Sequence, residues 1–383
     1  MSACLNTRGF ATLLISSLVL LPGCFSPERI APRQLTPELL ALPSSIYVAD
    51  TGNNRIVHIA SMFGDGQQFL SGSGNNTFSQ PTGITAWQGR GYHTRFDLPS
   101  YKLYVVDRSN HRVVRLDNMN GDNWQTLGSL GNGASQFSRP ARLAKGFNSL
   151  WVTDVGNSRF VEMSDPDPSL WEPVRVDTDL WAGLRGGCFQ NPGVGAATDG
   201  MGIAHRLGHV YLSTAQWVVK VDRLSESEQI APCIDDRQQH FGPWNYFAEV
   251  CCFDADGNSR FLVRSETGAV VRASAPRGIA IGRRGEIYVA DTGNDRIVRF
   301  DNMTGAGWTE LRQDPGGKGD SIKRPSAVAL DSSGGIYIAD TGNNRIVYVK
   351  DMSGTGWTTC CTSPTGGSLF AGPMDVYVGP GPR

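Results

Sequence analysis

Residues 46–57 read IYVADTGNNRIV, and nearly the same twelve residues recur at 287–298 as IYVADTGNDRIV and at 336–347 as IYIADTGNNRIV. Each copy opens with four apolar residues in succession, which is typical of a β-strand buried on both faces. The Asp-Thr-Gly-Asn segment that follows has the composition of a tight turn. Arg-Ile-Val then begins a second strand, so each copy predicts a β-hairpin.

We expect three side chains to shape the turn of the first copy. Asp50 can accept hydrogen bonds from N–H groups of the turn, Gly52 permits a positive φ, and Asn53 tolerates the left-handed region. Because the other close copies carry the same residue types, the sequence predicts that one junction is built repeatedly.

Less similar copies of the motif lie between the close ones. LYVVDRSNHRVVRL begins at Leu103, LWVTDVGNSRFVEM at Leu150 and a degraded copy, VYLSTAQWVVKV, at Val210. Most starts are about 50–60 residues apart, which suits a four-stranded sheet with insertions. A second element, PTGITA from Pro81 and its relatives, precedes every copy except the first.

That missing element occurs instead near the C-terminal end, as GPMDVYVG from Gly372. In a ring of sheets this segment can supply the innermost strand of the first sheet and leave no open edge. We therefore predict an all-β fold, a six-bladed β-propeller over residues 43–383, closed by a C-terminal strand in the first blade. A seventh blade is less favoured, because FLVRSETGAVVRAS begins only 26 residues before the next copy.

These motifs resemble the NHL repeat, whose characteristic core is similar to IYVADTGNNRIV, and the resemblance covers roughly residues 43–379. It implies a propeller of NHL repeats. For function it implies several classes, namely protein-binding scaffolds, RNA-binding domains and a metal-dependent lyase. The formal net charge of -1 lacks the electrostatic footprint of a nucleic-acid binder, so we expect no nucleic acid as partner.

The N-terminal residues form a different segment. FATLLISSLVLLPGC is an apolar stretch too short to span a bilayer, and its end resembles the bacterial lipobox. The resemblance implies a signal peptide at 1–23, a lipidated Cys24 and a tether over 24–42. Phe25 stands where Asp would signal retention in the inner membrane, so we expect an exported, membrane-anchored lipoprotein of the outer membrane or cell surface. An ordinary secretory signal peptide that contains Cys is the alternative.

The other cysteines fit export to an oxidising compartment. Their even number predicts up to three structural disulfides with open pairing. These candidates are Cys188, Cys233, Cys251, Cys252, Cys360 and Cys361.

The repeats also place acidic and basic residues in register. These residues are Asp50, Asp107, Asp154, Asp291 and Asp340, with Arg55, Arg112, Arg159, Arg296 and Arg345. One hypothesis is a charged funnel that binds an anionic ligand. We favour a structural repeat ring in which each Asp pairs with an Arg within or between blades, because desolvated charges need partners.

The fourth copy departs from the repeat. Thr214 and Trp217 replace its Asp and Arg, and an insertion at about 225–275 contains HFGPWNYFAEVCC. Long insertions in repeat architectures usually form loops and often carry the specific function. The candidate binding residues are therefore Trp217, His240, Trp244, Tyr246 and Phe247.

The sequence contains no nucleophile elbow, phosphate loop or HExxH motif, so it gives no catalytic residue. We expect a monomeric, lipid-anchored scaffold that binds an envelope protein or glycan through propeller loops, without a cofactor. The alternative is a metal-dependent lyase or lactonase-like hydrolase at the central pore, for which calcium or zinc is the candidate metal.

Overall fold

The computed structural model describes residues 45–87, 101–163 without 134, 147, 148 and 158, and 274–380 without 303–305, 317–319 and 362–366. It also describes the short segments 173–175, 202–206, 209–213, 218–222, 263–264 and 270–271. The chain divides into two units, Met1–Leu42 and Pro43–Arg383, and all described residues belong to the second. Within them, no helix has the length and apolar character needed to cross a bilayer.

Six main sheets account for most of the described residues. The first has the order β29 (Pro373–Gly379), β1 (Ser45–Asp50), β2 (Arg55–Ile59), β3 (Gln68–Leu70). The second contains β6 (Pro81–Trp87), β7 (Lys102–Asp107), β8 (Arg112–Leu116) and β9 (Gln125–Leu127). The third contains β12 (Pro140–Lys145), β13 (Leu150–Asp154), β14 (Arg159–Met163) and β15 (Pro173–Arg175).

The other main sheets follow the same order along the chain. The fourth contains β16 (Ile203–Arg206), β17 (His209–Ser213) and β18 (Val218–Asp222). The fifth contains β21 (Ile279–Ile281), β22 (Ile287–Asp291), β23 (Arg296–Phe300) and β24 (Thr309–Leu311). The sixth contains β25 (Ala327–Leu330), β26 (Ile336–Asp340), β27 (Arg345–Val349) and β28 (Thr358–Cys360).

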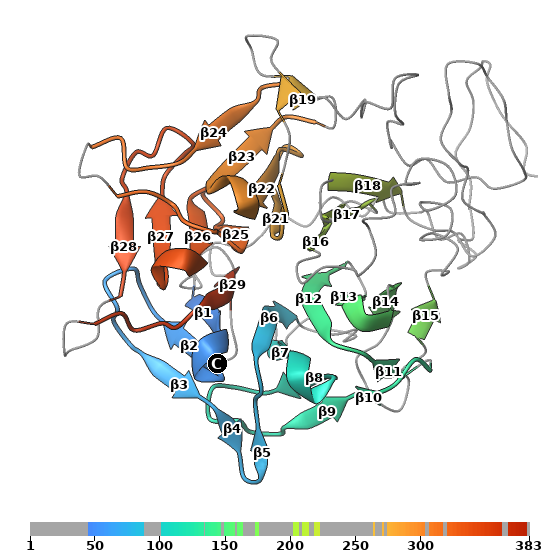
Figure 1. The fold of residues 1–383 in the computed structure, drawn as a ribbon. Helices are drawn as coiled ribbons and strands as arrows, with labels where there is room; N and C mark the ends of the chain where they lie inside the picture. The colour runs from blue at the N-terminus through green and yellow to red at the C-terminus, as the bar shows by residue number, and fades with distance from the viewer. Residues whose placement is uncertain are drawn as a thin grey trace, which may run out of the picture. The chain divides into compact units, whose positions relative to one another are not determined.

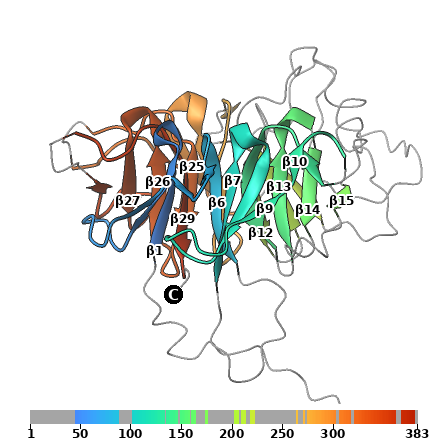
Figure 2. The same ribbon diagram turned by 90° about the horizontal axis from the view of Figure 1, so that it is seen from below.

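Short elements complete the description. The two-stranded ribbons are β4 (Gly72–Ser73) with β5 (Asn76–Thr77), β10 (Ser129–Leu130) with β11 (Gln136–Phe137), and β19 (Val263–Arg264) with β20 (Val270–Val271). The 3-10 turns are η1 (Thr51–Asn53), η2 (Arg108–Asn110), η3 (Val155–Asn157), η4 (Thr292–Asn294) and η5 (Thr341–Asn343). Each of these turns joins the second and third strands of its sheet, and the short coils lie along one rim of the ring, the upper one in Figure 2.

The innermost strands of the six sheets form a closed cycle. β29 contacts β6, β6 contacts β12, and contacts continue through β16, β21 and β25 back to β29, so the sheets surround one axis (Figure 1). We call these six strands the inner strands. The prediction of an all-β propeller is confirmed. The number of blades stays a prediction, because most of residues 223–273 lie outside the described residues.

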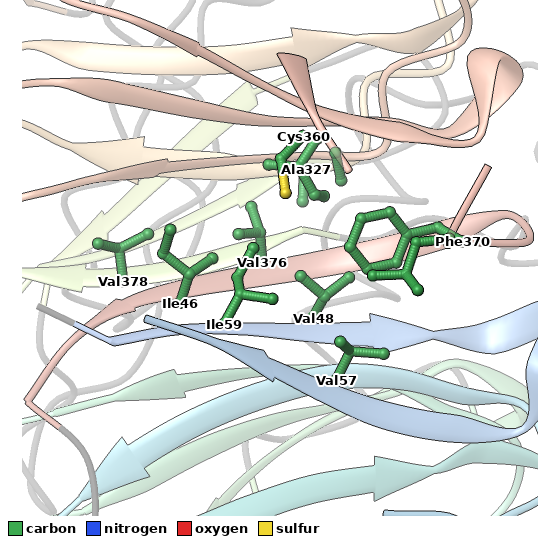
Figure 3. Close-up of a cluster of buried hydrophobic side chains, with 12 residues drawn as sticks. Ile46, Val48, Val57, Ile59, Ala327, Cys360, Phe370, Val376 and Val378 are labelled. Atoms are coloured by element: carbon green, nitrogen blue, oxygen red, sulfur yellow. The ribbon is translucent and has the colours of Figure 1, made fainter. Parts of the chain in front are cut away.

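The predicted closure by a C-terminal strand is also confirmed. β29 pairs antiparallel with β1, with Ile46 opposite Val378 and Val48 opposite Val376. The seam between the sixth and first sheets buries an apolar cluster, shown in Figure 3. Ala327 of β25 and Cys360 of β28 join that cluster from the sixth sheet. Burial of this apolar surface stabilises the closed ring.

The hairpin turn differs from the expectation in two residues. Asn54, not Asn53, lies in the left-handed region, with a φ of 51°. Gly52 has no positive φ, and its role is close approach, because a Cβ on Gly52 would lie 2.5 Å from the carbonyl oxygen of Ala371. The Gly52 N–H donates to that same oxygen over 2.8 Å. The turn therefore needs Gly because another loop of the first sheet packs directly against it.

The turn residues also link successive sheets. The Thr51 Oγ1 donates to the Pro81 carbonyl at 2.5 Å, and the Asn54 Oδ1 accepts from the Gln80 N–H at 2.7 Å. His111 occupies the Asn54 position of the second sheet, and its Nδ1 accepts from the Arg139 N–H at 2.9 Å. At the seam the Asn344 Oδ1 accepts from the Gly372 N–H at 2.7 Å. A hydrogen bond of the same type therefore joins the first sheet to the second and the sixth sheet to the first.

Because the turn is closely packed, a side-chain atom added at Gly52 should destabilise the fold. Gly52→Ala should lower the free energy of unfolding by about 1–3 kcal/mol, because the added methyl group meets backbone atoms of Ala371. Gly367→Ala is the matched control, since a Cβ at Gly367 meets no atom within 4 Å. Urea unfolding of both variants measures the difference. Equal stabilities for the two variants would contradict this account of the turn.

Candidate functional site

The Asp residues of the motif are the centres of one repeated network. Asp50 is fully buried, and its Oδ2 accepts from the Asn53 Nδ2 and the Arg55 Nε, each at 2.8 Å. Its Oδ1 accepts from the Ala371 N–H at 2.8 Å. The same three types of bond surround Asp107, Asp154, Asp291 and Asp340, all with distances of 2.6–2.9 Å.

These contacts place the charged repeat ring inside the sheets. Each Asp forms its ion pair with the Arg five residues later, within its own hairpin. Burial raises the pKa of the Asp154 and Asp340 carboxyls, and the hydrogen bonds to these carboxyls oppose that rise. The motif Asp residues have no exposed surface with which to bind a ligand.

Arg142 of β12 crosses the axis of the ring. Its Nη1 donates to the carbonyl oxygens of Thr82 and Met374, the latter at 2.6 Å, and its Nη2 donates to the Ser326 carbonyl at 3.0 Å. The three acceptors belong to the second, first and sixth sheets, while Arg142 belongs to the third. Its side chain is 5% exposed. One guanidinium group therefore ties four sheets together at the axis.

Asp375 of β29 is the acidic partner of this group. Its Oδ1 lies 3.8 Å from the Arg142 Nη1, and its Oδ2 accepts from the Ile84 N–H at 3.0 Å. Burial raises the pKa of the Asp375 carboxyl, and the charge of Arg142 opposes that rise. Burial also lowers the pKa of Arg142; the charge of Asp375 opposes this effect, and the charge of Arg108 adds to it.

Two further arginines lie at this end of the inner strands, and sequence reasoning missed all three. Arg108 opens η2 and is 8% exposed. Arg277 precedes β21, and its Nη1 lies 3.8 Å from the Met374 Sδ. A signal was present in the sequence. Arg108 stands where three other copies of the motif have Thr. Arg142 stands at the position of the Gly in PTGITA, and Arg277 stands at the position of its first Thr. We call Arg108, Arg142 and Arg277 the axial arginines.

The opposite end of the inner strands carries Lys145 and Tyr377. The Lys145 Nζ lies 5.7 Å from the centroid of the Tyr377 ring, across from β12 to β29. The Lys145 side chain is exposed, yet the surrounding protein lowers the pKa of its ammonium group by desolvation. This end of the ring is therefore lined by an aromatic and cationic pair.

Ten of the predicted site residues lie outside the described part of the chain. These are Cys24, Trp217, His240, Trp244, Tyr246 and Phe247, together with Cys188, Cys233, Cys251 and Cys252. Cys360 and Cys361 are described, and their sulfur atoms adjoin at the end of β28. The disulfide pairing of the six cysteines stays a prediction.

Within the described ranges no three His, Cys, Asp or Glu side chains come together in a group that could hold a metal ion. In the described part of the chain, the Arg142 guanidinium lies near the Asp375 carboxylate, and the Arg277 guanidinium lies near the Met374 side chain.

Comparison with known families gives the repeat its name. A family model described as NHL repeat matches residues 274–300 and 323–347. The chain contains NHL repeats. Each matched segment runs from the loop before an inner strand, through that strand and the motif turn, into the third strand of its sheet. The NHL repeat of this chain is therefore built around the buried Asp.

One solved structure supports the fold. The crystal structure of a nidogen/laminin complex matches with a TM-score of 0.54 and 12% identity, over 88% of this chain and 98% of that chain. Virginiamycin B lyase from Staphylococcus aureus matches with a TM-score of 0.41 and 12% identity, over 73% and 83%. At these identities the likeness concerns the fold alone. No curated protein matches the sequence.

Arg142 should be indispensable to the ring of sheets. Arg142→Met should lower the free energy of unfolding by about 3–5 kcal/mol, because Asp375 and the carbonyl acceptors would stay buried without their donor. Arg299→Met should cost less than about 1 kcal/mol, because Arg299 pairs with the half-exposed Asp301. Denaturant unfolding followed by circular dichroism compares the two. A similar loss in both variants would contradict the role of Arg142.

Proposed function

We propose that this protein is a lipid-anchored binding scaffold of the cell envelope, which recognises a protein or glycan partner through propeller loops. The proposal rests on the observation that the Asp residues of the repeat are buried and bond its Arg residues. The motif Asp residues are fully buried, and each bonds an Arg and an Asn of its own turn. Residues that build the repeat are thereby committed to the fold, so specificity belongs to residues that differ between repeats.

The charge at the axis supports a scaffold over a metal-dependent lyase or lactonase-like hydrolase. A catalytic calcium or zinc ion needs a convergent set of carboxylate, imidazole or thiolate ligands. The axis instead holds Arg142 and Arg277 near Met374, with Asp375 paired to Arg142. Positive guanidinium groups repel a metal cation, so the proposal requires no cofactor.

The insertion at about 225–275 is the proposed contact region. It interrupts the repeat after a copy whose Asp and Arg are replaced, and it holds His240, Trp244, Tyr246 and Phe247. Aromatic side chains of this kind supply large contact areas at protein interfaces and stack on sugar rings. Trp217, in the altered copy itself, completes the proposed set.

Photo-crosslinking in cells tests the contact region. Full-length protein carrying a photoreactive residue in place of Trp244 should give one discrete cross-linked product in the envelope fraction. Protease and glycosidase digestion then distinguish a protein partner from a glycan. The matched control places the same residue at Ser332, an exposed turn position in the sixth sheet. The same product at both positions, or none at Trp244, would count against the proposal.

The anchor is tested separately. Cys24→Ala should move the protein from the detergent phase to the aqueous phase in a detergent partition, because a lipid-bearing Cys24 is the proposed attachment. Cys4→Ala is the control, since Cys4 lies within the segment proposed to be cleaved off. A Cys24→Ala protein that stays in the detergent phase would refute the lipid anchor.

A further inference from the structure

The rim opposite the 3-10 turns is where β1 begins and β29 ends. β1 runs from Ser45 toward η1, so Ser45 lies at the end of the sheet away from that turn. Gly379, the last residue of β29, pairs with Ser45. β2 returns from η1, and its last residue, Ile59, pairs with Ile46. We call this rim the lower rim, since it lies below in Figure 2.

A turn of the same type follows β2, β8 and β27 at the lower rim. The first N–H of this turn donates to the carbonyl five residues later, as Ala60 does to Asp65 and Lys350 does to Thr355, each at 2.8 Å. In the turn after β2, Met62 packs against the apolar cluster at the seam. The residue after the Met is exposed in all three turns, and these residues are Phe63, Asn120 and Ser353.

Phe63 departs from the polar residues at this position. Asn, Thr and Ser occupy it in three other copies of the turn. Phe63 is 87% exposed, and its N–H donates to the Ser61 Oγ at 3.2 Å. The Ser61 Oγ in turn donates to the Asp65 Oδ2 at 2.9 Å. These bonds fix a turn that presents an aromatic ring to the surroundings, where a covering surface would lower its free energy.

The route of the chain says which surface covers this ring. Residues 25–44 join the proposed lipid-bearing Cys24 to Ser45, where the described chain begins. A flexible chain of this length spans roughly 25 Å on average. The six residues of β1 extend over about 20 Å. The tether therefore lets the lower rim meet a bilayer easily, whereas most of its length would be used merely to pass the sheet if the opposite rim faced the lipid.

We propose that Phe63 inserts its ring into the lipid surface that anchors the protein, so that the lower rim faces the membrane and the rim with the 3-10 turns faces away. Aromatic side chains are stable at the boundary between headgroups and acyl chains. This inference rests on the lipid anchor of the proposed function. The anchor holds Phe63 close to the bilayer, and this high effective concentration allows a single side chain to dock.

The charges of the lower rim predict the character of this contact. Lys145 and Lys350 are exposed there, and so are Asp65 and Asp351. Because both signs occur together, the rim has no basic surface that would select anionic lipid. Docking should therefore depend on apolar insertion, and it should be the same on zwitterionic and anionic vesicles and at low and high salt.

Photo-crosslinking to lipid tests the contact. Full-length protein purified from membranes is placed in phosphatidylcholine vesicles, with or without phosphatidylglycerol, and carries benzoylphenylalanine in place of Phe63. Irradiation should give a lipid adduct in the mass spectrum of the intact protein, with equal yield in both kinds of vesicle. The control carries the same residue at Lys323, which is exposed on the opposite rim, where its N–H donates to Asp340, and it should give no lipid adduct.

A second probe position separates the effect of Phe63 from that of the label. Benzoylphenylalanine at Ser353 lies on the same rim, in the turn of the sixth sheet. Phe63→Ser introduces the residue of that turn and should lower the yield of lipid adduct at position 353 about tenfold, because the apolar insertion is lost. Phe69→Ser is the control. Phe69 lies further along the sheet, with its ring centroid 4.5 Å from the Arg55 guanidinium carbon, so its replacement should leave the yield unchanged.

Three results would overturn the proposal. They are the absence of a lipid adduct at position 63, a protein adduct in its place in isolated envelopes, and equal yields at position 353 in Phe63→Ser and Phe69→Ser. Detergent partition of the same preparation measures the anchor separately. Anchored protein without a lipid adduct at position 63 therefore contradicts the docking of Phe63 and leaves the lipid anchor intact.

Discussion

The buried carboxylate of the repeat is the interaction on which the ring depends. In the first sheet Asp50 joins three pieces of chain, because it accepts from the Ala371 N–H, from Asn53 in the turn and from Arg55 in β2. Since the carboxylate is fully buried, loss of any one donor leaves buried lone pairs without a partner. In each sheet that contains it, this Asp therefore fixes the start of the inner strand relative to the hairpin.

Hydrogen bonds within each sheet, between neighbouring sheets and across the axis together hold the whole ring. Within a sheet the Asp holds the hairpin to the inner strand. Between sheets the Thr hydroxyl and the left-handed turn residue bond the next inner strand, as Thr51 and Asn54 do. Across the axis Arg142 joins the third sheet to the first, second and sixth. The repeat supplies the first two kinds of link, whereas the third depends on a residue that departs from it.

The sequence predicted the elements whose signals are local. Continuous apolar runs such as Ile46–Ala49 revealed strands buried on both faces, and the misplaced GPMDVYVG element revealed the closing strand. The turn assignment failed at Gly52 and Asn53 because composition shows a turn but not what packs against it. The packing partner, Ala371, is distant in the chain. The axial arginines were missed because they stand out only when the inner strands and the motif turns of different sheets are aligned.

The closing strand has a consequence for biosynthesis. Asp50 and Ala371 are 321 residues apart, yet they share a hydrogen bond within one sheet. A chain emerges from the ribosome with its N-terminal end first, so β1 waits with one edge unpaired until β29 has been made. During that interval the edge is a template for pairing with other chains. The nascent chain is therefore exposed to aggregation from the synthesis of β1 until β29 has paired with it, and a chaperone that shields β1 would act in that interval.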